Sequence, residues 1–359
     1  MIRKNNDKIL FLIPALFNSG GMERIATSLM NLLVERCGQN IGIVVHCKNT
    51  ESFFPLNKGI EVYSLGLTGR VKDSRILAAK RLRKLIKDTK ANTLVNVDVA
   101  MIQVAALACP HLLGCKIVTW EHFSLADANL LARWKRYFSA LVSNRTVVLT
   151  QADRNRYPKL LRNRVEVISN FTQLNDLGRQ SGYSKKTVLA VGRLEPVKGF
   201  DLLIQAWKFV SRQFPDWKLK IVGNGSVRQE LMSQIENEKL ANSIFLEGIS
   251  SNMADYYANS SLFVLSSRFE PFGLVLIEAK SFGLPIVSFD CPFGPREIVK
   301  DGEDGILVEN GNVELLANAM IQMISNPDMA KKYGNNAICD FKKNWNADVV
   351  LTKWENILD

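Results

Sequence analysis

The feature of this chain that most restricts its fold is a series of short apolar segments that occurs twice. Each segment has the length of a buried strand, and helical patterns separate most of the neighbouring segments. A strand, helix, strand order predicts a parallel sheet with helices on both faces. The first series covers residues 8–14, 41–47, 92–97, 116–121, 145–149 and 165–169. The second series covers residues 187–191, 219–222, 244–246, 262–265 and 285–289.

The two series are separated by a polar segment, residues 173–186, that is rich in Asn, Gly, Gln, Ser and Lys. A chain of 359 residues fits two domains, and a hydrophobic content of 47% allows each of them a buried core. We therefore predict a Rossmann-like domain over residues 1–172, a linker over residues 173–186, and a second doubly wound domain from residue 187. Such a pair of domains faces across a cleft that binds a ligand.

One loop of the second half places two cations where a strand is expected to end. Gly192 and Arg193 follow the strand at 187–191, and Lys198 stands five residues after Arg193. Ligands of open α/β sheets bind at the carboxyl ends of the strands, so these two cations are placed to converge on a diphosphate. Taken singly, each is more often a solvated surface charge.

A second loop reads Glu-Pro-Phe-Gly-Leu-Val-Leu-Ile-Glu from Glu270 to Glu278. Glu270 is expected at the end of a strand and Glu278 inside the helix that follows. The backbone donors of the intervening turn belong to Phe272, Gly273 and Leu274. Paired carboxylates also suit a glycosidase, but one of these precedes the helix and the other lies two turns inside it, so they do not flank one bond. We expect them to contact two hydroxyl-bearing parts of one ligand.

Three glycines and a histidine follow other predicted strands. Gly20 and Gly21 open a helix, where backbone N–H groups approach an anion, although a plain turn is the commoner role of such a pair. Gly223 lies in a Gly-Asn-Gly loop that lacks the third glycine of the dinucleotide fingerprint. His122 follows the strand at 116–121 and is placed to hydrogen-bond a polar ligand, whereas a lone histidine is more often structural.

Charge is divided unevenly along the chain. Residues 1–175 carry a net charge of +14 and residues 176–359 carry −3, which gives the +11 of the whole chain. The first half is therefore expected to meet an anionic partner. No nucleic-acid-binding module accompanies the charge, so nucleic acid is not the expected partner.

Two segments of the basic half, residues 74–87 and 130–138, combine cations with apolar or aromatic residues, as membrane-surface helices do. In the first segment, one side of the helix is expected to hold Ile76, Leu77, Leu82, Leu85 and Ile86. Contact with an anionic membrane is one expectation for these segments, and a helix docked on its own sheet with a solvated cationic face is the other.

The composition predicts a cytoplasmic protein with free thiols and no bound metal. No run of about 18 apolar residues is present, and the first apolar segment is too short for a signal peptide. The six cysteines form no Cys-x-x-Cys pair, and the three histidines do not cluster with them. No Asp-x-Asp triplet is present to hold a divalent ion.

Taken together, these motifs resemble those of the retaining glycosyltransferases of family 4, also called group 1, which have the GT-B fold. The similarity covers most of the chain and is strongest over residues 192–308. It implies that Arg193 and Lys198 hold the donor diphosphate, that Glu270 contacts the donor sugar, and that Glu278 binds the ribose hydroxyls.

The resemblance also implies where the other candidate residues act. His122 is implied near the donor sugar as a catalytic-site residue. Donor-binding roles are implied for Gly20, Gly21, Gly192, Gly223, Phe272, Gly273 and Leu274. The last helix, residues 344–359, is implied to cross back onto the first domain, which leaves residues 187–343 as the donor domain.

What the resemblance implies is a hexosyltransferase that needs no metal or other cofactor and moves a sugar from a nucleotide-sugar donor, expected to be UDP-linked, to a glycan. The resemblance implies that configuration is retained by front-face attack, in which the leaving phosphate helps to take the acceptor proton, so no protein general base is expected. The basic first domain suggests an acceptor carried on a membrane lipid diphosphate, as in the assembly of bacterial O-antigen, lipopolysaccharide or exopolysaccharide. Two alternatives remain, a nucleotide-sugar epimerase of the same fold and a catalytically idle binding protein.

Overall fold

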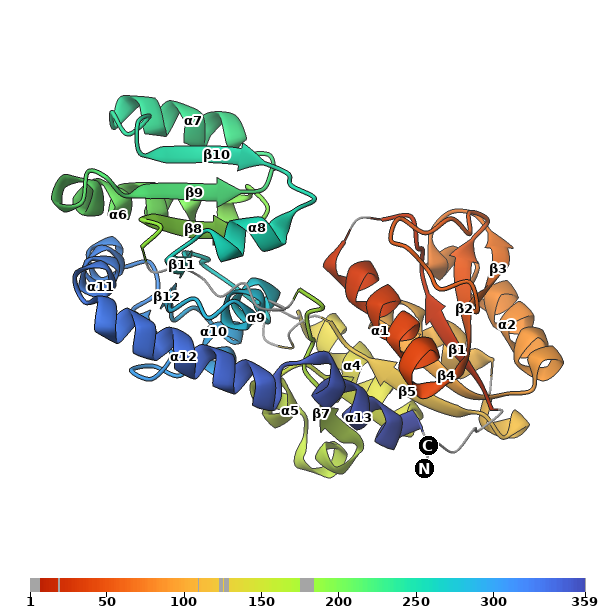
Figure 1. Cartoon of the computed structure of the whole chain (residues 1–359). Helices are drawn as coiled ribbons and strands as arrows, with labels where there is room; N and C mark the ends of the chain where they lie inside the picture. The colour runs from red at the N-terminus through yellow and green to blue at the C-terminus, as the bar shows by residue number, and fades with distance from the viewer. Residues whose placement is uncertain are drawn as a thin grey trace. The chain divides into compact units, whose positions relative to one another are not determined.

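The computed structural model describes residues 7–18, 20–108, 110–122, 125, 129–174 and 184–358. The chain divides into two compact units. Unit 1 takes the described residues of Met1–Asn170 and Val350–Asp359, and unit 2 takes those of Phe171–Val349. Each unit is a sheet with helices packed against it (Figure 1). Residues 175–183 of the predicted linker lie outside the described residues.

Unit 1 is built on a seven-stranded sheet with the order β3-β2-β1-β4-β5-β6-β7, in which every neighbouring pair is parallel. The strand order changes direction between β1 and β4, and open α/β sheets bind ligands at the carboxyl ends of strands at such a point. The strands are β1 (Lys8–Ile13), β2 (Asn40–Cys47), β3 (Glu61–Leu67), β4 (Ala91–Val97), β5 (Lys116–Trp120), β6 (Arg145–Val148) and β7 (Val165–Val167).

Helices connect these strands and cover the sheet of unit 1. They include α1 (Gly21–Cys37), α2 (Arg75–Thr89), α3 (Ile102–Leu107), α4 (Leu130–Val142), α5 (Gln151–Arg156) and the 3-10 helices η1 (Val71–Asp73), η2 (Val99–Met101), η3 (Pro110–Leu113) and η4 (Lys159–Arg164). The expectation that Ile76, Leu77, Leu82, Leu85 and Ile86 share one side of α2 was wrong in part. Leu82 and Ile86 are buried with Ala78 and Ala79, but Ile76 and Leu77 are 69% and 46% exposed. At about 100° per residue, these two positions point away from the centre of the buried face.

Unit 2 is built on a six-stranded parallel sheet with the order β10-β9-β8-β11-β12-β13. The strand order changes direction between β8 and β11, which again marks an expected ligand-binding edge. The strands are β8 (Thr187–Val191), β9 (Lys218–Val222), β10 (Ile244–Gly248), β11 (Leu262–Leu265), β12 (Ile286–Phe289) and β13 (Gly305–Val308).

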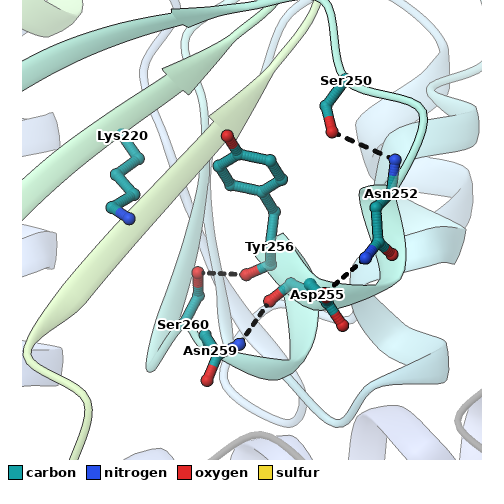
Figure 2. Close-up of a pocket in the computed structure, with 7 residues that line it drawn as sticks. All are labelled: Lys220, Ser250, Asn252, Asp255, Tyr256, Asn259 and Ser260. Carbon is teal, nitrogen blue, oxygen red and sulfur yellow. Dashed lines mark hydrogen bonds between the residues drawn. The ribbon is translucent and has the colours of Figure 1, made fainter.

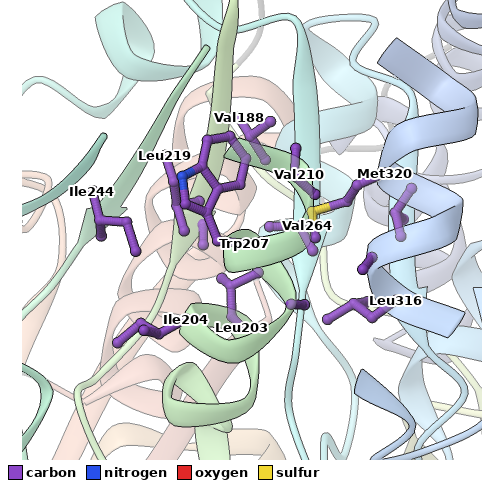
Figure 3. Packing of buried hydrophobic residues seen from close by; sticks show 14 of the residues in the cluster. Val188, Leu203, Ile204, Trp207, Val210, Leu219, Ile244, Val264, Leu316 and Met320 are labelled. Atoms are coloured by element: carbon purple, nitrogen blue, oxygen red, sulfur yellow. The ribbon is translucent and has the colours of Figure 1, made fainter. Parts of the chain in front are cut away.

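The core of unit 2 is centred on Trp207, which is fully buried among aliphatic side chains of the sheet and of a neighbouring helix (Figure 3). Its indole N–H donates to Ser243 Oγ at 3.2 Å, so burial leaves no polar atom of this ring unsatisfied. The helices are α6 (Phe200–Gln213), α7 (Arg228–Asn237), α8 (Met253–Ala258), α9 (Leu274–Ser281), α10 (Gly294–Ile298), α11 (Val313–Ser325) and α12 (Pro327–Asn344).

The predicted doubly wound parallel sheet is confirmed in both units, but two strands were missed. The edge strand β3 buries only Leu65 and Leu67 and contains Gly66, so it lacks the continuous apolar run of the other strands. The strand β13 has four residues, of which three are partly exposed. The predicted last helix corresponds to α13 (Ala347–Leu358), whose residues from Val350 group with unit 1.

Candidate active site

The loop between β8 and α6 carries the two predicted diphosphate-binding cations. Arg193, directly after Gly192, is exposed to solvent. Lys198 ends a 3-10 turn, and its side chain is 19% exposed. The Lys198 Nζ atom lies 2.6 Å from Glu270 Oε2. The structure therefore brings Lys198 and Glu270 together and places Arg193 at the solvent side of the same loop.

Glu270 is held in place by contacts on both its side chain and its backbone. The residue is 7% exposed, and its Oε2 atom accepts from Lys198 and, at 3.2 Å, from Ser267 Oγ. Its backbone carbonyl accepts from Gly294 N at 2.9 Å. A carboxylate removed from water to this degree needs such partners, because desolvation strongly disfavours an unpaired charge. The carboxylate is thus fixed in one position after β11.

An ion pair that the sequence did not reveal joins the two loops of the site. Arg268 donates to both carboxylate oxygens of Asp201, at 2.7 and 2.6 Å, and to Pro196 O at 2.7 Å. The hydrogen bonds from Arg268 to the Asp201 carboxylate lower the pKa of Asp201. Ser266 Oγ donates to Lys198 O at 3.0 Å, which adds a second link. The 67 residues between Arg268 and Asp201 explain why no local pattern marks this pair.

Two glycines allow the backbones around the site to approach one another. A Cβ atom on Gly199 would overlap Ser266 O, and one on Gly223 would overlap Gly192 O. Both residues also have positive φ angles, 63° and 147°, which L side chains rarely adopt. Close packing of loops therefore explains Gly223 without a ligand, and its predicted role in donor binding stays a prediction.

Helix α9 begins at the predicted Phe-Gly turn. Gly273 precedes the helix with a φ of 93°, a conformation that glycine adopts without strain. The N–H groups of the first turn, which starts at Leu274, have no acceptor within the helix, so the helix start favours an anion. Phe272 is 5% exposed, and its ring meets that of Trp345 at 6.2 Å between centroids. Its side chain therefore packs inside unit 2.

Glu278 lies inside α9 and is 2% exposed. Its Oε2 atom accepts from the hydroxyl of Tyr257 at 2.7 Å. Tyr257 belongs to α8 and is itself fully buried, with its ring stacked on those of Phe263 and Phe282 at 5.9 and 5.4 Å. The stacked ring fixes the hydroxyl, and the hydroxyl fixes the carboxylate. Tyr257 is thus a positioning residue that no sequence motif indicated.

The predicted contact of Glu278 with a ribose can be tested with Tyr257→Phe, which removes one hydrogen bond to the Glu278 carboxylate while the ring stack remains. With UDP as the probe nucleotide, isothermal titration is expected to show binding weakened about fivefold. Tyr256→Phe is the matched control, since its hydroxyl donates to Glu247 Oε2 at 3.1 Å and not to Glu278. Equal affinity for the probe in the two variants would contradict the positioning role.

In unit 1, Gly20 and Gly21 stand at the start of α1 as predicted. The carboxylate of Glu23 folds back onto this loop so closely that a Cβ atom on Gly20 would overlap Glu23 Oε2. Glu23 is 6% exposed, and its Oε1 atom accepts from Asn18 at 3.1 Å. A carboxylate already lies at this helix start, where the approach of an anion was expected, and two negative charges there would repel each other. The donor-binding role of Gly20 and Gly21 stays a prediction.

His122 lies two residues after the end of β5, one residue more than predicted, and its ring packs on Trp120 at 4.4 Å between centroids. Trp120 in turn meets Trp354 of α13 at 4.8 Å. Burial lowers the pKa of His122 to about 3, so the ring is neutral at pH 7. Among the described residues, its Nε2 atom has no hydrogen-bond partner. The ring is therefore suited to hydrogen-bond a neutral polar ligand and not to act as a cation.

The lowered pKa of His122 predicts a pH-dependent stability. The unfolded chain binds a proton at His122 below its ordinary pKa of 6.5, whereas the folded chain binds it only near 3. The free energy of unfolding should therefore rise with pH between these values. Urea unfolding of His122→Asn from pH 4 to 7 should show a shallower slope. His111→Asn, at an exposed position of the same unit, is the control, and an unchanged slope in His122→Asn would contradict the assignment.

A polar pocket of about 360 Å³ lies beside α8 in unit 2 (Figure 2). It is lined by Lys220, Ser250, Asn252, Asp255, Tyr256, Asn259 and Ser260. The Lys220 Nζ atom lies 5.8 Å from the centroid of the Tyr256 ring. The pocket shares no lining residue with the Lys198–Glu270 pair, so it is a separate feature of the unit.

Neither a metal cluster nor a membrane span is found in the part of the chain that the structure describes. No three side chains of His, Cys, Asp or Glu come together there as a metal site would require. The described helices include none that is long and apolar enough to cross a membrane. Independence from metal stays a prediction.

Comparison with known proteins identifies the family. The model of glycosyl transferases group 1 matches residues 179–339, and that of glycosyltransferase family 4 matches residues 19–176. An uncharacterized glycosyltransferase of Haemophilus influenzae is 30% identical over 355 residues, 98% of this chain and 99% of that protein. The amylovoran biosynthesis glycosyltransferase AmsD of Erwinia amylovora is 31% identical over 363 residues, with the same coverage of 98% and 99%.

A solved structure agrees with the fold. The crystal structure of a point mutant of S. aureus TarM, in complex with fondaparinux, α-GlcNAc-glycerol and UDP, matches with a TM-score of 0.81 at 18% identity, over 98% of this chain and 100% of that one. Solved neighbours of this kind are GT-B glycosyltransferases. The two family models, the full-length relatives and the two parallel-sheet units together place this chain in the group 1, family 4 glycosyltransferases of the GT-B fold.

Proposed function

We propose that this glycosyltransferase moves a hexosyl group, with retention of anomeric configuration, from a UDP-sugar to a glycan carried on a membrane lipid diphosphate. The observation that carries the proposal is the contact between Lys198 and Glu270, 2.6 Å apart, at the carboxyl edge of the unit 2 sheet beside the start of α9. A cation, a carboxylate and a helix start suit a ligand with a diphosphate at one end and a sugar at the other.

In the proposed reaction, the bond between the anomeric carbon and the diphosphate oxygen breaks, and a bond to an acceptor hydroxyl oxygen forms on the same face. The acceptor proton passes to the departing diphosphate, so no protein base is required. Negative charge grows on the diphosphate as it leaves. Lys198, Arg193 and the N–H groups at the start of α9 stabilise that charge without a metal ion.

The donor is proposed to lie along the edge of unit 2, with its sugar at Glu270 and its ribose at Glu278. The buried position of Glu278 and its hydrogen bond with Tyr257 support a fixed acceptor for hydroxyl groups. UDP is the proposed nucleotide because the TarM mutant of the same fold crystallised with UDP. His122 of unit 1, as a neutral ring with an unpartnered nitrogen among the described residues, is proposed to hydrogen-bond a neutral polar ligand.

The acceptor is proposed from the charge of unit 1 and from the relatives. A net charge of +14 over residues 1–175 favours a phosphorylated acceptor. AmsD carries the name of a glycosyltransferase of amylovoran biosynthesis, which supports a role in building a bacterial surface polysaccharide.

A donor screen tests this function first. Thermal unfolding is measured with UDP, UDP-glucose, UDP-galactose, UDP-N-acetylglucosamine and GDP-mannose, and stabilisation by UDP and one UDP-sugar is expected. Proton NMR of the product then reads its anomeric configuration, and EDTA should leave the rate unchanged. Stabilisation by GDP-mannose alone, or an inverted product, would overturn the corresponding part of the proposal.

One further assay distinguishes the proposed transferase from the two alternatives, an epimerase and an idle binding protein. An epimerase would convert the UDP-sugar in the absence of acceptor, whereas the proposed transferase leaves the sugar configuration intact. An idle binding protein would be stabilised by UDP but would turn over no nucleotide sugar, with or without acceptor. The close contact of Lys198 with Glu270 favours the transferase over the idle protein, because binding alone does not require a cation at the sugar-contacting carboxylate.

A further inference from the structure

Helix α4 of unit 1 exposes its apolar side and buries part of its polar side, which is the reverse of a helix that packs on its own sheet. Its buried residues are Arg136, Ser139 and Ala140. Its large apolar residues are exposed: Leu130 by 73%, Leu131 by 67%, Trp134 by 63%, Phe138 by 41% and Leu141 by 57%. At 100° per residue, these five fall within an arc of about 100°, so they form one continuous stripe. A stripe of this kind is normally turned toward the core.

The orientation of α4 follows from its polar face. Arg136 Nε lies 3.6 Å from Glu121 Oε2, and the side chains of the two residues are 7% and 3% exposed. The helix also starts at a side-chain cap, since Asn129 Oδ1 accepts from Ala132 N at 2.9 Å. Turning the helix over would bury the apolar stripe but would take Arg136 away from Glu121. Burial raises the pKa of Glu121 to about 8, and Arg136 is the largest influence that offsets this by favouring the ionised carboxylate. The outward apolar stripe is therefore a fixed feature of unit 1.

The neighbouring segment extends the exposed face of α4. Tyr137 donates from its hydroxyl to Arg156 O at 3.4 Å, and Arg164 donates to Leu141 O at 3.0 Å. These bonds hold α4 beside η4, whose Leu160 is 86% exposed. We name the α4 surface by its exposed residues, which are Leu130, Leu131, Trp134, Lys135, Phe138, Leu141, Arg156, Lys159 and Leu160.

The charge around this surface has a single sign. Residues 130–164 contain nine Lys or Arg residues and one acid, Asp153. Asp153 is 5% exposed, and its carboxylate accepts from Thr150 Oγ1 at 2.9 Å and from Leu125 N at 3.0 Å. The one acid of the segment is thus buried and hydrogen-bonded, and the exposed charge of the segment is positive.

We propose that the α4 surface docks unit 1 on an anionic lipid bilayer, an inference that rests on the proposed lipid-linked acceptor. The apolar stripe enters the headgroup layer, with Trp134 at the level where aromatic rings of membrane proteins gather. Lys135, Arg156 and Lys159 meet the lipid phosphates. A second copy of this chain would bring the same cations face to face, so charge favours lipid over self-association.

The other basic amphipathic helix, α2, fits this role less well. Its exposed large apolar residues are Ile76 and Leu77 alone. Three of its arginines already make hydrogen bonds within unit 1. Arg75 donates to Gln103, Arg81 to Leu65 O and Arg83 to Ala108 O. The structure therefore points to α4, and α2 supplies a matched control.

Flotation of the full-length chain with vesicles tests the α4 surface. Wild type should bind vesicles of phosphatidylglycerol and phosphatidylcholine and not vesicles of phosphatidylcholine alone. Lys135→Gln/Lys159→Gln should lower the partition coefficient about fivefold per lysine. Leu131→Ser/Trp134→Ser should lower it about tenfold or more. The control Ile76→Ser/Leu77→Ser should stay within about twofold, since α2 is outside the surface.

The outcomes separate docking from catalysis. Loss of binding in the α2 variant with none in the α4 variants would overturn the proposal. So would concentration-dependent self-association of wild type that the Leu131→Ser/Trp134→Ser variant abolishes in sedimentation without lipid. Stabilisation by UDP, measured in solution without vesicles, reports on the proposed function alone. If the chain binds vesicles through α4 but is not stabilised by UDP, the docking proposal is supported and the proposed transferase function is contradicted. If UDP stabilises the chain but vesicles do not bind it, only the docking proposal is contradicted.

Discussion

Replacing Lys198 by Met is expected to lower kcat about 10²-fold to 10³-fold. The Lys198 Nζ atom stands 2.6 Å from the Glu270 carboxylate, so its position is fixed before the donor arrives. In the proposed reaction the diphosphate gains negative charge only as it leaves. A preplaced cation therefore stabilises the transition state more than the bound donor, and UDP affinity should fall by a smaller factor than kcat. Methionine keeps most of the apolar stem of lysine and removes the ammonium group, with its charge and its hydrogen bond to Glu270.

The measurement is turnover of the UDP-sugar that the donor screen identifies. Lys208→Met is the matched control, because Lys208, on α6 of the same unit, also pairs with a glutamate, Glu238, at 2.5 Å. Its exposed pair should contribute little, so kcat should stay within about twofold. If Lys198→Met retained kcat within about threefold of wild type while UDP still bound, Lys198 would not stabilise the leaving group.

Glu270→Gln adds a test of the contact itself. Residues that touch and act on one ligand give non-additive effects, so Lys198→Met/Glu270→Gln should be about as slow as the slower single variant. Additive losses would mean that the two residues act independently, which their distance of 2.6 Å argues against.

The sequence identified the parts of this site that local patterns encode. Lys198 and Glu270 each stand in a short motif at the end of a strand, and the structure brings them together. Tyr257 and Arg268 were missed because their roles depend on distant partners. Tyr257 meets Glu278 across 21 residues, and Arg268 meets Asp201 across 67. No periodicity of a single helix or strand reports such a contact, so these residues become visible only in the fold.

The same limit applied to the helices of unit 1. The mixture of cations and apolar residues in α2 and α4 was readable, but the direction of each apolar stripe was not. In α4 the direction depends on Glu121, which follows β5 and draws Arg136 inward. In α2 it depends on small residues, Ala78 and Ala79, which are buried with Leu82 and Ile86 while Ile76 and Leu77 are exposed. Tertiary partners, and not the helix pattern, set both orientations.

Replacing Lys280 by Met is expected to lower the free energy of unfolding by about 3–5 kcal/mol. Lys280 is fully buried in α9 and donates to Asp304 Oδ2 and Asp340 Oδ2, both at 2.7 Å. Without the ammonium group, two carboxylates that are 1% and 7% exposed would face each other without their shared cation. Removing one partner of a buried ionic network leaves uncompensated charge, and this is far more costly than losing a surface pair.

Lys300→Met provides the matched control, because Lys300 Nζ bonds the same carboxylate, Asp340 Oδ1, at 2.8 Å but is 54% exposed. Its loss should reduce the free energy of unfolding by about 1 kcal/mol or less in urea titrations. The pH dependence adds a second test. Burial of the Asp340 carboxyl opposes its ionisation, but hydrogen bonds from Lys280 and Lys300 hold its pKa at about 2, below its ordinary 3.8.

In wild type, the stability from Asp340 is therefore present above pH 3.8 and is lost as the pH falls toward 2. In Lys280→Met both carboxyls lose one cation, while Asp340 keeps its ion pair with Lys300. Burial already raises the pKa of Asp304, and loss of the Lys280 charge should raise it further, so the variant should lose stability as the pH rises. The deficit relative to wild type should thus be smaller at pH 4 than at pH 8. A deficit that is equal at both pH values would show that lost packing, and not buried charge, is the cause.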